Sequence, residues 1–146
     1  MKIDPSDLRD LKLFKYYRLV RKWACKTNNL TDADLELLIF FDCLGRFTRN
    51  DYKDGVYLLH WDKDRWERLR REGWISVWRE RNRTTQKYAI YQTSTKAKLL
   101  ITRIYKMLLG EEDIPTSNKS IFWKNKTYTD KVFNHAINLM INDKNR

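Results

Sequence analysis

The chain has 146 residues, of which 34% are charged and 42% hydrophobic, a composition typical of one soluble globular domain that excludes a disordered chain. No apolar run approaches the roughly 20 residues that cross a bilayer, and the N-terminus lacks the apolar core of a signal peptide, so we expect a cytoplasmic protein with no membrane partner. The formal net charge of +11 favours a polyanionic partner, with nucleic acid first and an anionic membrane surface second, over a basic surface kept only for solubility.

The first predicted helix runs from Asp4 to about Lys26. Asp4 is a candidate N-cap and Pro5 suits the first helical position. Apolar residues then recur at three-residue steps and form a broad stripe. Such a stripe at a chain end often pairs with something outside its own compact core.

A second helix is predicted between Thr31 and Gly45. Thr31 and Asp34 have the spacing of a capping box, and Gly45 suits the position just after a helix. Because this segment is apolar nearly all round, we expect it at the buried centre of the domain. Cys25 and Cys43 fit no metal spacing, so we expect two buried small apolar side chains and no disulfide.

Two shorter helices follow and form a helix-turn-helix candidate. The first has Thr48 as its N-cap and is predicted to end near Gly55. The second is predicted from about Trp61 to Glu72, with Gly73 as its terminator.

A β-hairpin is then predicted from residues 74–80 and 86–92, where apolar and polar residues alternate on either side of a polar tip. Thr93 or Ser94 caps a further helix that Gly110 ends, and a last amphipathic helix runs from about Thr129 to Asn142. The predicted organisation is a domain of residues 1–110, a linker of residues 111–128 and a C-terminal helix within residues 129–146.

The residues that commonly carry chemistry form no recognisable site. His60 and His135 are about 75 positions apart, and Asp62 with Asp64 lacks the glycine and closing glutamate of a calcium loop. There is no Gly-rich phosphate loop, Cys/His metal set or nucleophile elbow. We therefore expect no enzymatic activity, metal or cofactor.

Basic residues gather on the second short helix and the hairpin. Between residues 63 and 87 the sequence holds nine Lys and Arg against four Asp and Glu. The planar guanidinium of Arg suits phosphates and base edges, so these residues are candidates for DNA binding. The strongest are Arg81 and Arg83 at the tip, and the others are Arg79, Lys87, Lys63, Arg68, Arg70 and Arg71.

Over roughly Leu8 to Gly110 the chain resembles winged helix-turn-helix proteins of the multiple-antibiotic-resistance-regulator (MarR) type. The similar segments are "LTDADLELLIFFDCLG", "DRWERLRREGWI" and "YQTSTKAKLLITRIYKMLLG". The resemblance implies a mainly α winged-helix fold with one hairpin wing and extra helices at both ends. It also implies a double-stranded-DNA-binding transcriptional regulator that dimerises through its terminal helices.

Two features depart from that family pattern. Family wings commonly carry an Asp closely followed by Arg, which is absent from this tip. The helix before the wing also holds Asp62, Asp64 and Glu67 in its first half, where carboxylates repel phosphate and accept only from groups such as cytosine N4. The wing is therefore the stronger DNA-binding prediction. No operator sequence or small-molecule effector follows from these residues.

Two alternatives stay open. The acidic start of the second short helix suits a winged helix that binds protein, such as an RNA-polymerase accessory factor or a phage assembly component. An RNA or single-strand binder would need Trp74, Trp78 and Tyr91 exposed as stacking platforms.

Overall fold

The computed structural model describes residues 4–6, 9, 14–58, 61–82, 84, 88–115 and 128–143. It forms two compact units, one of residues 31–101 and one of residues 1–30 together with 102–146. The described chain is mainly helical with a small antiparallel sheet, which confirms the predicted mainly α class. The predicted boundaries at residues 110 and 128 stay a prediction, and most of the expected linker lies outside the described residues.

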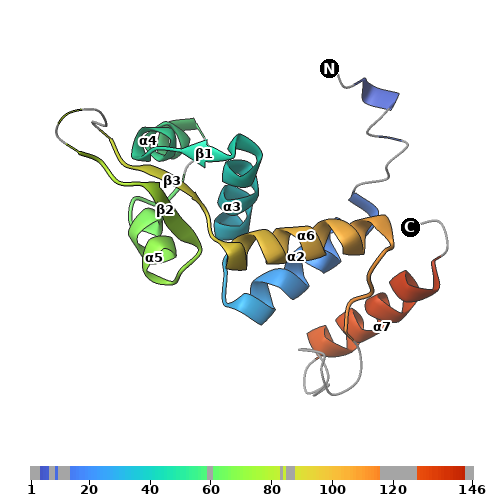
Figure 1. Cartoon of the computed structure of the whole chain (residues 1–146). Coiled ribbons are helices and arrows are strands. Elements are labelled where there is room, and N and C mark those ends of the chain that lie inside the picture. The colour runs from blue at the N-terminus through green and yellow to red at the C-terminus, as the bar shows by residue number, and fades with distance from the viewer. Residues whose placement is uncertain are drawn as a thin grey trace. The chain divides into compact units, whose positions relative to one another are not determined.

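The unit of residues 31–101 alternates helices and strands. In chain order it contains α3 (Asp32–Leu44), β1 (Arg46–Phe47), α4 (Arg49–Leu58), α5 (Arg65–Arg71), β2 (Ile75–Arg79), β3 (Ile90–Thr93) and the first half of α6 (Thr95–Leu109). The strands lie in the order β1-β3-β2, with both pairs antiparallel (Figure 1). The hairpin formed by β2 and β3 is thus confirmed, although Tyr88 and Ala89, which were predicted to lie in its second strand, precede β3. Strand β1 adds a third strand that the sequence did not predict.

Helix α3 begins with the predicted capping box. The Thr31 hydroxyl accepts from the Asp34 amide, the Asp34 carboxylate accepts from the Thr31 amide, and Gly45 ends the helix with a φ of 82°. The expectation that α3 lies at the buried centre is confirmed for Leu35, Leu37, Leu38 and Phe41, but Phe40 is 42% exposed. Cys43 lies in the same stretch and is exposed, so only Cys25 is the buried thiol that was expected, and the two do not form a disulfide.

An aromatic cluster forms the core of this unit. The rings of Phe41 and Phe47 stack with centroids 4.1 Å apart, and Trp66 contacts both edge-on. Trp61 joins the cluster against Phe41 and is 3% exposed. Burying rings of this size supplies much of the hydrophobic stabilisation of a small domain.

Trp61 also explains two incorrect helix boundaries. Helix α4 continues to Leu58, past Gly55, because Gly55 is a point of close approach: a Cβ there would lie 1.9 Å from the Trp61 ring. Trp61 itself fills the core ahead of α5, which begins only at Arg65. The expected helix from Trp61 is therefore four residues too long at its start.

Helix α6 begins and ends as predicted. The Ser94 hydroxyl accepts from the Ala97 amide, so Ser94 is the cap, while Thr93 donates to the Asp42 carboxylate of α3 at 3.0 Å. Gly110 follows the helix with a φ of 86°.

The unit of residues 1–30 and 102–146 pairs α2 (Phe14–Asn28) with α7 (Tyr128–Asn142). Lys15 lies 2.5 Å from Asp143 and Lys26 lies 3.2 Å from Asp130, so the two helices run antiparallel. The predicted α7 is confirmed to within one residue, and most of the predicted first helix before Phe14 lies outside the described residues. Among the described helices none is long and apolar enough to cross a membrane.

Candidate nucleic-acid interface

A β-bulge turns two consecutive side chains of the hairpin toward one face of the sheet. Val77 pairs with Tyr91 and Arg79 pairs with Ile90, so Trp78 is an extra residue in β2. Residues directly opposite across a pair share a face, which places Arg79 with Ile90 and Arg46 with Gln92. Ile90 and Gln92 are two residues apart on β3, so Arg46 and Arg79 lie on the same outer face.

Trp78 holds both of these arginines. The Arg46 guanidinium lies 3.8 Å from the centroid of the Trp78 ring, and that of Arg79 lies 5.3 Å from it. Trp78 is 38% exposed, so the stack is open to solvent. Stacking on an aromatic ring leaves the N–H edge of a guanidinium available for phosphate. We call Arg46 and Arg79 the sheet-face pair.

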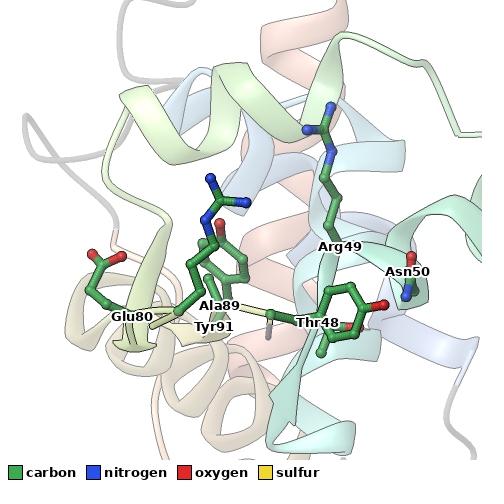
Figure 2. A pocket seen from close by; sticks show the side chains of 8 residues that line it. Thr48, Arg49, Asn50, Glu80, Ala89 and Tyr91 are labelled. Atoms are coloured by element: carbon green, nitrogen blue, oxygen red, sulfur yellow. The ribbon is translucent and has the colours of Figure 1, made fainter. Parts of the chain in front are cut away.

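A second pair of arginines borders a hollow of about 260 Å³ between the start of α4 and the hairpin. Figure 2 shows Arg49 and Asn50 on the α4 side of this hollow and Glu80, Ala89 and Tyr91 on the hairpin side. Its lining residues are Thr48, Arg49, Asn50, Glu80, Arg81, Tyr88, Ala89 and Tyr91. We call Arg49 and Arg81 the hollow pair.

Arg49 also lines a second hollow of about 480 Å³ along α4, together with Lys53 and Lys63. Tyr57 lines this hollow and is 82% exposed. Lys53 and Lys63 are exposed as well. The basic surface of the hairpin side therefore extends over α4 to the residues just before α5.

Helix α5 presents a different arrangement, because Asp34 of α3 engages two of its arginines. Arg68 donates to both oxygens of the Asp34 carboxylate, at 2.9 and 2.7 Å, and Arg65 forms a further ion pair with it. The Asp34 side chain is fully buried, and that of Arg65 is 11% exposed. A bidentate Arg–carboxylate contact of this kind is among the stronger hydrogen-bonded pairs in proteins.

The electrostatics of Asp34 follow from this contact. Burial by itself would raise the pKa of the Asp34 carboxyl, but hydrogen bonds from Arg68, the Thr31 amide and Arg65 outweigh it and hold the pKa below its usual value of 3.8. The hydrogen bonds to Asp34 in turn raise the pKa of Arg68. Asp34 is therefore a charged group at neutral pH that ties α5 to α3.

The structure separates the predicted DNA-binding residues into two groups. Arg79, Arg81, Lys63 and Arg71 are exposed, and none of their side chains has an ion pair or hydrogen bond to another described residue. Arg68 is engaged by Asp34, and Arg70 lies 3.8 Å from Glu67 and 5.0 Å from the centroid of the Tyr91 ring. Arg83 and Lys87 lie outside the described residues.

Sequence reasoning missed Arg46 and Arg49. Both lie before residue 63, outside the basic stretch, and β1 has only two residues, too few to show an alternating pattern. The only available signal was the pair Arg46-Phe47 between a helix-ending Gly45 and the N-cap Thr48.

The single-strand alternative required three exposed aromatic residues. Trp74 is 2% exposed and Tyr91 is 9% exposed, so neither is a stacking platform. Trp78 alone is exposed, and Arg46 already lies over its ring. Trp74, Trp78 and Tyr91 therefore do not form the set of exposed stacking rings that this alternative required.

The chemistry available here is recognition of anions by arginine. In the part of the chain that the structure describes, no three His, Cys, Asp or Glu residues come close enough together to hold a metal ion. Comparison of the chain with protein-family models, with curated proteins and with solved structures finds no match.

Proposed function

We propose that this protein is a double-stranded-DNA-binding transcriptional regulator of the winged-helix type that acts as a homodimer. The observation that carries the proposal is the set of four exposed arginines around the hairpin: Arg46, Arg49, Arg79 and Arg81. No carboxylate among the described residues forms an ion pair with any of them. An unneutralised cluster of this kind fits the regular negative charge of a DNA backbone.

The order of elements supports the winged-helix type. A helix, a short strand, two helices and a hairpin follow one another in residues 32–93, and the short strand pairs with the second strand of the hairpin. In such an arrangement the helix before the hairpin lies near the major groove and the hairpin reaches the neighbouring backbone or minor groove. The sheet-face pair and the hollow pair both border the hairpin.

The test measures the binding of a fluorescent duplex at several salt concentrations. Replacing Arg49 and Arg81 with Ala removes two phosphate contacts, so the slope of log affinity against log salt should become shallower by about 1.8. The matched control is the pair Arg18→Ala and Lys22→Ala, two exposed residues of α2 whose loss removes the same charge. If both double variants make the slope shallower by the same amount, the salt dependence reflects only the net charge of the protein. That result would contradict the assignment of the phosphate contacts to the hairpin side.

Dimerisation forms part of the same proposal and rests on the terminal helices. Part of their apolar surface packs within the chain, where Trp23 of α2 and Ile137 and Met140 of α7 are buried. Val132 and Leu139 of α7 remain 45% and 55% exposed. This exposed surface is available to a second copy, and a dimer would present two hairpins to the same duplex.

One observation favours a second candidate, a winged-helix protein that binds another protein. Tyr57 and Leu58 at the end of α4 are 82% and 77% exposed, and aromatic and aliphatic side chains of this kind are common at protein interfaces. The duplex titration separates the candidates, because a protein-binding factor would show no salt-dependent binding to duplex DNA.

A further inference from the structure

The helix that would face the major groove has few side chains free to read bases. Helix α5 has seven residues and is thus about 10 Å long. Trp66 and Leu69 are buried in the core, with exposures of 1% and 0%. Base reading would depend on the remaining polar side chains of α5 and on those just before it.

Asp34 removes two of these side chains from DNA. Arg65 and Arg68 both bind its carboxylate, which is fully buried and has Thr31 as a further partner. Turning either arginine outward to a base edge would leave this buried carboxylate short of a partner, which is strongly unfavourable. The ion pairs are therefore part of the fold and are not available for recognition.

Most of the other polar groups near α5 are unsuited to DNA. Asp62, Asp64 and Glu67 are exposed carboxylates, which repel phosphate and match few base-edge donors. Arg70 lies over the Tyr91 ring and near Glu67. Lys63, which lies between Asp62 and Asp64, and Arg71, which follows Glu67, remain as exposed cations.

The hairpin side differs from α5, because its four arginines form no ion pair with the exposed Glu80 or with any other described carboxylate. The sheet-face pair is held on Trp78, and the hollow pair borders a concavity beside the hairpin. Contacts from such positions go to phosphate and sugar, which carry no sequence information, or to the minor groove, where the base pairs are hard to distinguish.

We infer that the protein binds duplex DNA with little discrimination between base sequences. Its affinity comes from the four arginines of β1, α4 and the hairpin, while α5 stabilises the fold and does not read bases. The inference rests on the proposed function and narrows it to a regulator that recognises the charge and shape of the duplex and not its base sequence. Asp34 is the positioning residue for this behaviour, because it holds Arg65 and Arg68 away from the groove.

The experiment combines selection from a random-sequence duplex pool with titrations of several unrelated duplexes of equal length. The expected results are a pool with no enriched motif and affinities that agree within about tenfold, far below the thousandfold or greater preference of sequence-specific proteins. An enriched motif, or one duplex bound a thousandfold more tightly than the rest, would overturn the inference while leaving duplex binding intact. Absence of binding to every duplex would overturn the proposed function itself.

Two double variants that remove the same charge then separate the contribution of the hairpin side to DNA binding from that of α5 and the residues just before it. Arg49→Ala with Arg81→Ala should weaken binding to all duplexes by a similar factor. Lys63→Ala with Arg71→Ala should have the smaller effect and should leave the relative affinities of the duplexes unchanged. If the Lys63 and Arg71 variant instead alters the ranking of the duplexes, α5 reads bases and the inference is wrong. Circular dichroism of each variant confirms that the fold is retained.

Discussion

Asp34 shows how one side chain can serve two elements at once. Its carboxylate accepts from the Thr31 amide at the start of α3 and from Arg65 and Arg68 of α5. A buried carboxylate is tolerated only where charges and donors compensate for lost hydration, and here two guanidinium groups supply them. The residue therefore contributes both to a helix cap and to the packing of α5 on α3.

We predict that Asp34→Asn destabilises the protein by about 3–5 kcal/mol, because it leaves two arginines facing a neutral amide at a buried site. Urea unfolding at neutral pH measures this loss. The control is Asp32→Asn, which changes the same charge at an exposed position of the same helical turn and should cost much less. Equal losses for the two variants would contradict the structural role of Asp34.

The free energies of unfolding of the wild type and of Asp34→Asn should also depend differently on pH. The pKa of Asp34 is lower in the folded state than its ordinary value of 3.8, so the unfolded chain binds the proton more readily. The contribution of Asp34 to stability is thus complete above about pH 4–5 and is lost as the pH falls through the folded pKa. Asp34→Asn should lack this component, and its stability should fall less steeply than that of the wild type below pH 4.

At the scale of secondary structure, glycine has two different functions in neighbouring segments. Gly73 follows α5 with a φ of 84° and has open space where a side chain would be. Gly55 lies inside α4, where the Trp61 ring occupies the space of a Cβ. The first is needed for backbone conformation and the second for packing.

We predict that Gly55→Ala destabilises the protein by about 1–3 kcal/mol, since the methyl group would overpack the buried Trp61 ring. Helix propensity alone would instead make Ala about 1 kcal/mol more favourable than Gly at a mid-helix position. The sign of the change in unfolding free energy therefore distinguishes the two effects. A stabilised variant would mean that Trp61 does not pack against α4 at this position.

These elements also show what the sequence could and could not predict. Local signals gave the capping box at Thr31, the Ser94 cap and the bounds of α7, because each depends on residues close together in the chain. The end of α4 and the start of α5 depend on where Trp61 packs, which is a tertiary contact.

The candidate site was predicted in part for the same reason. Arg79 and Arg81 were evident from the hairpin pattern and are exposed. Arg46 and Arg49 became candidates only when β1 paired with β3 and α4 met the hairpin. The engagement of Arg68 by Asp34, 34 positions away, has no local sequence signature.

At the scale of the whole molecule, the charges of the described residues fall into two classes. Several cations pair with carboxylates and hold elements together, as Lys15 does with Asp143, Lys26 with Asp130 and Arg103 with Glu112. The four arginines around the hairpin have no such partner among the described residues. These four arginines lie around one hairpin, and a local group of cations without carboxylate partners favours binding of a polyanion there.

The oligomeric state is the remaining property of the whole molecule that the proposed function requires. Val132 and Leu139 lie seven residues apart on α7 and therefore on the same side of the helix, and both are largely exposed. We predict that the wild type sediments as a dimer and that Val132→Glu with Leu139→Glu sediments as a monomer, because carboxylates buried at an apolar interface are strongly unfavourable. Sedimentation equilibrium over a range of concentrations gives both masses. The control is Asn138→Glu with Asn142→Glu, which adds the same charge at exposed positions of α7 and should leave the dimer intact. A wild type that remains monomeric at every concentration would reject the homodimer, and duplex binding would then have to come from a single set of four arginines.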